Sequence, residues 1–325
     1  MPVEWTQTGK IYATSECVVG LMSIFSNTLV LKAIYRNKSL RTVTYCFTAS
    51  LALSDLLVGI AVPPLVILAY IGLPPDFHGC LLINSLVILF NNISILTLVN
   101  LTFDRYLAIC HPVFHRRKMT ITRAIRLLAV TWVVAIVLGL VPVMGWNNGK
   151  ENFTGTCSFV AVISKEYMVY LITLGLKVPV LVVMYVVYAY IFYVIRGVHK
   201  QTSMPTARQR SSRRFDRKVR RATTIFFVFF MYSICFLPLY VINCIHLFLP
   251  EKVPSTETVL FFVVLSHANS FINPIVYSYK NERLRNTYAE ILSCGGDARN
   301  RRRLQPLQHS FITSTRVSSQ ASDPR

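Results

Sequence analysis

Residues 80–105 read CLLINSLVILFNNISILTLVNLTFDR, and the rest of the chain is organised around this stretch. It has no fully charged side chain before Asp104, and about 20 apolar residues in an α-helix cross the roughly 30 Å hydrocarbon core of a bilayer. Because amides that face lipid lack hydrogen-bond partners, we expect the polar side chains of this stretch to face the interior of a helix bundle. These side chains are Asn84, Asn91, Asn92, Ser94 and Asn100.

The composition places the whole chain among membrane proteins. Of its 325 residues, 53% are hydrophobic, and the mean hydropathy is +0.48, which is too apolar for an ordinary soluble domain. The net charge of +20 would suit a nucleic-acid-binding protein, but the basic residues crowd into short segments between apolar spans, which argues against nucleic acid as a partner. The N-terminus shows no separate cleavable signal, so we expect the first span to target the chain to the membrane.

Seven apolar stretches are long enough to cross a bilayer. Each is predicted to be helical, because a single span can satisfy its backbone hydrogen bonds only in that way. The predicted fold is an all-α, seven-transmembrane helix bundle with a short amphipathic surface helix, in a receptor domain at 1–293, followed by a disordered cytoplasmic tail at 294–325. The spans run roughly over 12–35, 44–70, 80–108, 124–146, 167–195, 219–249 and 257–279, and the surface helix is NERLRNTYAEIL at 281–292.

Loop charges set the expected orientation. The segments after the first, third and fifth spans and the C-terminal tail carry most of the Lys and Arg, for example Arg36, Arg116 and Arg208. Because cytoplasmic loops are enriched in these residues, the pattern predicts a multi-pass plasma-membrane protein with its N-terminus outside and its C-terminus inside. The sequon at Asn152 then predicts an extracellular glycosylation site, whereas the sequon at Asn37 falls on the cytoplasmic side and is discounted.

The loops carry further candidate modification and interaction sites. Cys80 and Cys157 both face the oxidising outer side, which predicts a disulfide bond between them. Cys294 is either a palmitoylation site or an unmodified thiol, and the basic run at 298–303 is expected to contact anionic lipid. The polar segment 199–221 is predicted to be a cytoplasmic loop that is either a solvated linker or a partner site.

A carboxylate inside the second span requires compensation. Asp55 lies at mid-membrane depth, where an isolated charge is costly, so it needs a cation, a proton or a hydrogen-bond cage. Ser94, Asn269, Asn273 and Asn27 lie at similar depth in other spans. Together with the carboxylate of Asp55, their hydroxyl and amide oxygens suit a binding site for a hard cation. Sodium is the abundant cation of this kind. A structural network with bound water explains the same residues equally well.

Prolines are expected to kink several spans. Each removes one helical hydrogen bond, and kinks in the sixth and seventh spans would allow those helices to pivot, although irregular packing is the simpler interpretation. The prolines concerned are Pro63, Pro64, Pro142, Pro179, Pro238 and Pro274.

Six short motifs follow one another along the chain: SNTLVL around Asn27, LALSD ending at Asp55, DRY at 104–106, Trp132, FLP ending at Pro238 and NPIVY at 273–277. This ordered set resembles the rhodopsin-like G-protein-coupled receptors. The resemblance implies a signalling receptor and not an enzyme, and we see no GxxxxGK[ST], HExxH or GxSxG motif. It also implies that the residues for coupling to the G protein are Asp104, Arg105, Tyr106 and Tyr277.

Five longer stretches narrow the resemblance: GLVPVMGWNN (139–148), CSFVAV (157–162), EYMVY (166–170), LPLYVINC (237–244) and LSHANSFINPIVYSYK (265–280). They resemble adenosine receptors, and CSFVAV and the last two look closest to the inhibitory, Gi-coupled subtypes. The resemblance implies a receptor for extracellular adenosine or a related purine that signals through a heterotrimeric G protein and lowers cAMP. Receptor kinases, arrestin and membrane lipids are further expected partners.

The same resemblance assigns a ligand site. Phe159 would stack on the purine ring, and the amide of Asn243, which offers a donor and an acceptor together, would pair with the edge of the purine. Ser266 and His267 would meet the ribose hydroxyls, and Glu16 would orient His267 from the first span. The apolar walls would be formed by Val87, Leu239 and Val263.

Four residues depart from the adenosine-receptor pattern. Asn91 stands where Thr usually faces the ribose, and Phe236 replaces the usual Trp at the base of the pocket. Tyr240 replaces a smaller or imidazole-bearing residue. Lys177 is a cation inside an apolar span; because this is costly, we expect it either to extend to the membrane interface or to reach a polar group. These departures bear on agonist identity and not on the fold.

Two other functions are compatible with seven spans: a receptor of the same scaffold for another ligand, and a transporter or channel. A receptor of the same scaffold for another nucleobase or a lipid stays open, whereas an amine receptor is disfavoured because Val87 stands where an Asp counter-ion would be needed. A retinal pigment is disfavoured because Lys280 lies at the inner end of its span. A transporter or channel is disfavoured by the odd number of spans, the absence of inverted halves and the single deep acid.

Overall fold

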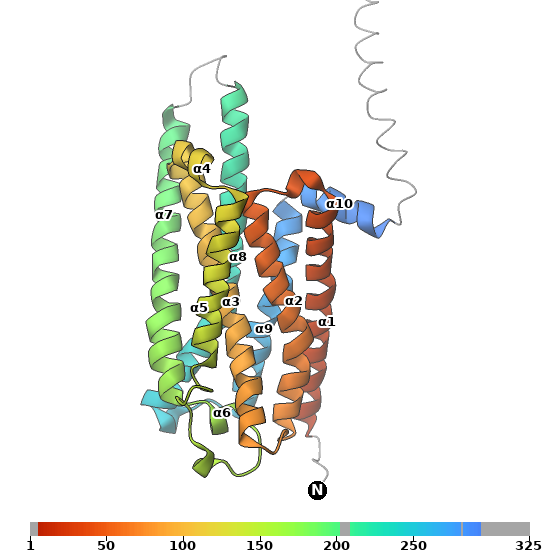
Figure 1. Ribbon diagram of the computed structural model, residues 1–325, viewed down its shortest axis with the longest axis vertical. Helices are drawn as coiled ribbons and strands as arrows, with labels where there is room; N and C mark the ends of the chain where they lie inside the picture. Colours follow the sequence, from red (N-terminus) through yellow and green to blue (C-terminus); the bar gives the residue numbers. More distant parts are fainter. Residues whose placement is uncertain (1–5, 202–208, 281, 294–325) are drawn as a thin grey trace, which may run out of the picture.

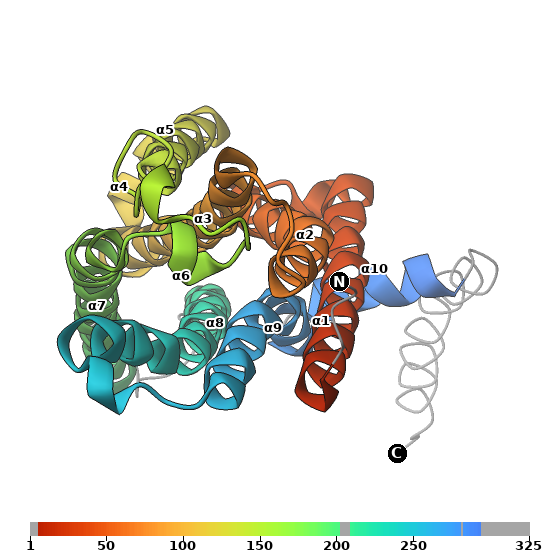
Figure 2. The same cartoon turned by 90° about the horizontal axis from the view of Figure 1, so that it is seen from below.

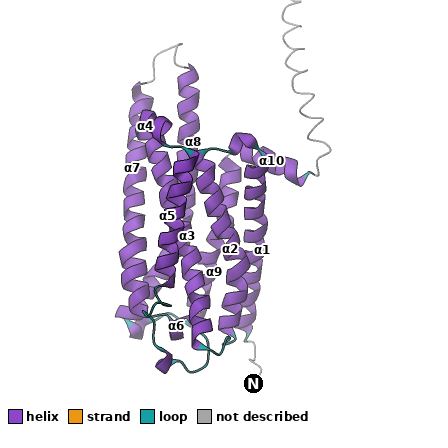
Figure 3. Cartoon of the chain, viewed as in Figure 1, coloured by secondary structure: helices purple, strands orange, loops and turns teal. Residues whose placement is uncertain are grey.

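The computed structural model describes residues 6–201, 209–280 and 282–293, which form a bundle of long helices that run up and down (Figure 1). Seven helical segments in this part of the chain are long and apolar enough to cross a membrane, as expected. No strand occurs in the described ranges, and the short helices lie at the two ends of the bundle (Figure 3). The long helices are α1 (Gln7–Arg36), α2 (Val43–Tyr70), α3 (Phe77–Cys110), α5 (Ile121–Leu140), α7 (Val178–Gln201), α8 (Gln209–Phe248) and α9 (Thr256–Lys280). The short helices are α4 (Pro112–Lys118), α6 (Phe159–Val162) and α10 (Glu282–Leu292).

Helix α3 is the central element of the bundle, and it packs against α2, α5, α7 and α8 (Figure 2). Its polar side chains face other helices, which confirms the expectation for this stretch. Asn84 and Asn92 are buried, and the amide of Asn100 donates to Thr131 Oγ1 on α5 at 2.7 Å. Sequence-local bonds satisfy others, because Asn84 Nδ2 donates to the carbonyl of Cys80 at 2.9 Å.

The fourth and fifth spans differ from their predicted form. The fourth was expected at 124–146, but α5 ends at Leu140 and the chain turns over 141–145, so Pro142 lies in a turn and kinks no helix. Since Pro142 has no N–H, it cannot extend the helical ladder. The fifth span opens with a π-helix over Tyr167–Lys177 that passes into α7, where Pro179 is the second residue. Its missing N–H accompanies this change of hydrogen-bond pattern.

The predicted loop at 199–221 is mostly helical, so that prediction was wrong. Helix α7 continues to Gln201, α8 begins at Gln209, and only 202–208 of this segment lie outside the described residues. Apolar positions explain the error, because Phe215, Val219 and Ala222 recur at helical spacing and pack on the core despite the many neighbouring arginines.

Helix α10 lies across the end of α1 rather than along the bundle (Figure 1). Its apolar face is buried through Leu284 and Tyr288, and Asn37 Nδ2 donates to Thr287 Oγ1 at 3.0 Å. The predicted surface helix is therefore present and joined to α1. The predicted tail at 294–325, with Cys294, lies outside the described residues.

Candidate ligand-binding site

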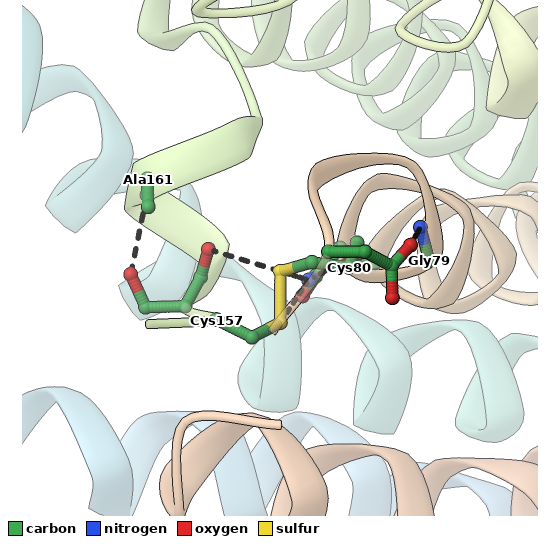
Figure 4. The surroundings of a disulfide bond; sticks show 7 residues. Gly79, Cys80, Cys157 and Ala161 are labelled. Carbon is green, nitrogen blue, oxygen red and sulfur yellow. Dashed lines mark hydrogen bonds between the residues drawn. A yellow bond between two sulfur atoms is a disulfide. The ribbon is translucent and has the colours of Figure 1, made fainter. Parts of the chain in front are cut away.

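A disulfide bond closes one end of the bundle, which we term the disulfide end. It joins Cys80 in the first turn of α3 to Cys157, with their Cα atoms 5.5 Å apart (Figure 4), and confirms the predicted pairing. The backbone N–H of Cys157 donates to the carbonyl of Gly72 at 3.0 Å. Two residues further on, Phe159 opens α6, whose N-cap Ser158 accepts from the Ala161 N–H at 3.2 Å. The tether therefore places Phe159 at a defined position over the bundle.

Beneath α6 lies a cavity of about 320 Å³. Its walls come from α1, α2, α3, α6, the π-helix, α8 and α9, so residues far apart in sequence converge on it. The structure brings together at this cavity every ligand contact that the sequence predicted on those helices: Phe159, Asn243, Ser266, His267, Val87, Asn91, Leu239, Val263 and Phe236. Their contact with a ligand stays a prediction.

Glu16 does not line the cavity, but it holds a residue that does. His267 Nδ1 is hydrogen-bonded to both carboxylate oxygens of Glu16, at 2.9 and 3.0 Å, and Glu16 is fully buried. This bond joins α1 to α9 and fixes the plane of the imidazole ring. Nε2 of His267 is the ring nitrogen left for a ligand, as the predicted orienting role of Glu16 requires.

Three further polar side chains of the cavity, Ser266, Asn91 and Asn243, keep free hydrogen-bonding capacity. Ser266 Oγ donates to the Val263 carbonyl at 2.7 Å and can still accept. Asn91 Nδ2 donates to the Val87 carbonyl at 3.1 Å, which leaves its Oδ1 as an acceptor. The amide of Asn243 makes no hydrogen bond within the described residues, so both its donor and its acceptor are available to a ligand.

A second polar cluster surrounds Asp55 in the middle of the bundle. Asn273 Nδ2 donates to Asp55 Oδ2 at 2.8 Å, and Ser94 Oγ donates to Asp55 Oδ1 at 3.2 Å. Asn27 Nδ2 instead donates to the Ser270 carbonyl at 2.9 Å, which joins α1 to α9. Of the predicted set, Asn269 is buried but makes no hydrogen bond to Asp55, and its Oδ1 has no partner within the described chain.

The opposite end of the bundle, which we term the Arg105 end, holds a buried ion pair. Arg105 and Asp104 are paired, and both also bond to Thr44 Oγ1 on α2. His115 on α4 completes the cluster, with its Nε2 2.8 Å from Asp104 Oδ1. Tyr277 is buried, and its hydroxyl has no partner among the described residues.

Comparison with known proteins settles the family. The sequence profile of the 7 transmembrane receptor (rhodopsin family) matches residues 26–277. The chain belongs to this receptor family. It is 39% identical over 297 residues to the adenosine receptor A3 of Ovis aries, with 89% of this chain and 91% of that protein covered. It is 37% identical to the A3 receptor of Canis lupus familiaris, at 85% and 89% coverage, and 34% identical to the human adenosine receptor A2b, at 87% and 90%.

The family assignment establishes the class of protein. The receptor is a multi-pass plasma-membrane protein of the G-protein-coupled class and not an enzyme, a transporter or a channel. Tyr106 follows Arg105 directly in the sequence, and its hydroxyl lies 3.2 Å from His111 Nε2. Its role in coupling to the G protein stays a prediction. Asn152 of the sequon is exposed, and its amide donates to the Asn148 carbonyl at 2.8 Å. Glycosylation there stays a prediction.

The contact of His115 with Asp104 and the aromatic surroundings of Lys177 were not predicted from the sequence. His115 lies ten residues after Arg105, and no short motif indicated that α4 would return it to Asp104. Lys177 was expected to extend to the interface or to reach a polar group, but it is 5% exposed and lies over two aromatic rings. It lines the cavity. Because a lysine in the middle of an apolar span is rare, the position of Lys177 was the sequence feature that could have indicated a role in the cavity.

Proposed function

We propose that this receptor binds extracellular adenosine or a related purine in the cavity at the disulfide end. The observation that carries the proposal is the convergence of Phe159, Asn243 and His267 on one cavity. An aromatic face stacks on a flat heterocycle, and an amide with both hydrogen-bonding groups free matches the donor and acceptor edge of a purine. A volume of about 320 Å³ suits a small ligand. The curated relatives named adenosine receptors support the same ligand.

The proposed signal is a shift in population between two forms of the bundle. An extracellular ligand must bind the active form more tightly than the resting form, or it changes nothing. In the resting form Asp104 and Thr44 hold Arg105 inside the bundle. Movement of α7 and α8 would release Arg105 to a heterotrimeric G protein, which we propose is of the inhibitory Gi class. The proposal requires the N-terminus to lie outside, as the loop charges predict.

We further propose that the Asp55 cluster holds a sodium ion in the resting form. The donor set fits a hard cation, because it offers a carboxylate and neutral oxygens. Three buried amide oxygens near the middle of the bundle have no partner within the described residues: Asn27 Oδ1, Asn269 Oδ1 and Asn273 Oδ1. When bound, the ion would neutralise the buried charge of Asp55, and Ser94 would contribute its hydroxyl oxygen.

The proposed function can be tested with cells that express the receptor together with Gi, and with membranes prepared from them. Adenosine is expected to displace a radiolabelled purine nucleoside, to stimulate nucleotide exchange on the G protein and to lower cAMP. Arg105→Ala is expected to keep ligand binding and to lose exchange. Absence of purine binding by the wild type would refute the ligand. A rise in cAMP would refute the Gi class, and normal exchange in Arg105→Ala would refute the role of the ion pair.

A further inference from the structure

Lys177 places a basic side chain in the cavity, and none of the described residues that line the cavity is acidic. It lies in the last turn of the π-helix, is 5% exposed and lines the cavity. The buried ion pairs of Asp104 with Arg105, of Asp104 with His115 and of Glu16 with His267 do not involve Lys177.

The amine of Lys177 lies over the faces of two aromatic rings. Its Nζ lies 5.6 Å from the ring centroid of Phe236 and 5.1 Å from that of Tyr240, within the range of cation–π attraction. Such rings stabilise a cation but carry no net charge, so they provide no anionic partner for the amine. A buried cation inside a membrane span marks a functional site by default, and its expected partner is an anion.

The spacing along α8 relates this cation to the proposed purine contacts. Phe236, Tyr240 and Asn243 recur at positions i, i+4 and i+7, so they share one face of the helix, and all three line the cavity. Seven residues at the helical rise separate Phe236 from Asn243 by about 10 Å along the axis. Lys177 Nζ lies over the rings of Phe236 and Tyr240, so it is within reach of a nucleoside-sized ligand whose base pairs with Asn243.

We propose that the ligand of this cavity is a purine that carries one anionic group of carboxylate size, which forms an ion pair with Lys177 Nζ. The proposal rests on the purine assignment above and narrows its ligand class. A single negative charge matches the one amine of Lys177, which has no acidic partner among the described residues, whereas a phosphate monoester carries about −1.5 to −2 at neutral pH. The other lysine of the cavity wall, Lys165, is only partly buried.

Three nucleosides of nearly equal size test the proposal in a competition assay on receptor membranes. They are adenosine, its 5′-carboxamide and its 5′-carboxylate, the last two differing in charge but hardly in shape. The 5′ position is chosen because Ser266 and His267 are assigned to the other ribose hydroxyls. The wild type is expected to bind the carboxylate at least tenfold more tightly than the carboxamide. A wild type that binds both equally, or prefers the carboxamide, overturns the proposal while leaving the purine assignment intact.

Substitutions at the lysine assign the preference to its charge. Lys177→Met keeps the length of the side chain and is expected to abolish the preference, whereas Lys177→Arg is expected to retain it. Lys165→Met is the matched control, since it removes an ammonium from the cavity rim, and it is expected to leave the preference unchanged. A carboxylate preference that persists in surface-expressed Lys177→Met overturns the proposal. If the wild type binds none of the three nucleosides, the proposal and the purine assignment fall together.

Discussion

Asn243 and Phe159 show how single side chains from distant segments define the ligand cavity. Asn243 belongs to α8, whereas Phe159 comes from the short helix α6 beside the Cys80–Cys157 disulfide. Neither is fully buried; Phe159 packs only against the outside of the apolar cluster around the disulfide, and Asn243 belongs to no apolar cluster. Substitution of either residue should therefore change ligand affinity without unfolding the receptor.

Asn243→Ala is predicted to weaken binding of adenosine about tenfold or more. Loss of the amide leaves the donor and the acceptor of the purine edge unpaired in a dry site, at roughly 1–3 kcal/mol each. Phe159→Ala is expected to cost a similar amount through lost stacking, whereas Phe159→Tyr, which keeps the ring, should be mild. Saturation binding measures the effect, and surface labelling controls for expression. Wild-type affinity in well-expressed Asn243→Ala would contradict the assignment.

Glu16→Gln is predicted to weaken binding selectively for ligands that carry ribose hydroxyls. The carboxylate holds His267 through two contacts at 2.9 and 3.0 Å, and an amide can accept through only one oxygen. Misorientation of the imidazole should reduce adenosine affinity roughly tenfold, within the range for one lost hydrogen bond to a charged group. Competition with adenosine and 2′,3′-dideoxyadenosine checks the prediction. An equal loss for both ligands would show that Glu16 acts on the whole bundle instead.

At the scale of secondary-structure elements, α3 is held at the Arg105 end by two neighbours. His115 on α4 bonds to Asp104, and Lys218 on α8 donates from its Nζ to the Ala108 carbonyl at 2.9 Å. The first contact holds Asp104, the partner of Arg105, and the second crosses from α3 to α8, which moves in the proposed mechanism. They therefore favour the form in which Arg105 stays inside the bundle.

His115→Phe is predicted to raise the basal rate of nucleotide exchange on the G protein, measured without agonist, by a few-fold. The substitution keeps a ring on α4 but removes the bond to Asp104, and loss of about 1 kcal/mol from the resting form shifts a two-state equilibrium by about fivefold. His78→Phe, at the other end of α3, is the matched control and should leave the basal rate unchanged. The role of α4 is refuted by a basal rate in His115→Phe that equals the wild-type rate.

On the scale of the whole molecule, the polar cluster at Asp55 is the connection through which we propose that the two ends of the receptor communicate. This cluster joins α2, α3 and α9 through Ser94 and Asn273 and lies between the ligand cavity and the Arg105 end. If an ion in the cluster prefers the resting form, it must lower agonist affinity, and the agonist must in turn lower the affinity for the ion.

Asp55→Asn is predicted to abolish a sodium-specific weakening of agonist binding. In the wild type, replacement of choline by sodium at constant ionic strength should reduce adenosine affinity several-fold, because choline controls for electrostatic screening. The neutral amide removes the charge that attracts the ion while keeping the shape of the side chain. An undiminished sodium effect in Asp55→Asn would place the sodium site elsewhere.

The number, type and order of the spans could be predicted from the amino-acid sequence. A backbone inside a bilayer has to satisfy its own hydrogen bonds, so a long apolar stretch becomes a helix whatever surrounds it. The ligand contacts, such as Phe159 and Asn243, were also named from the sequence, because the motifs of the family stand in order along the chain. That assignment depended on resemblance, since a lone aromatic or amide carries no sign of its partner.

The pairing of groups that are distant in sequence could not be predicted and follows from how the helices pack. Glu16 and His267 are separated by 251 residues, and no local pattern states that they meet. The return of His115 to Asp104 depends on the turn into α4, and the surroundings of Lys177 depend on how α8 packs against the π-helix. Helix formation follows from short-range hydrogen bonding, whereas the fate of a buried charge is set by whichever atoms packing brings within a few ångströms of it.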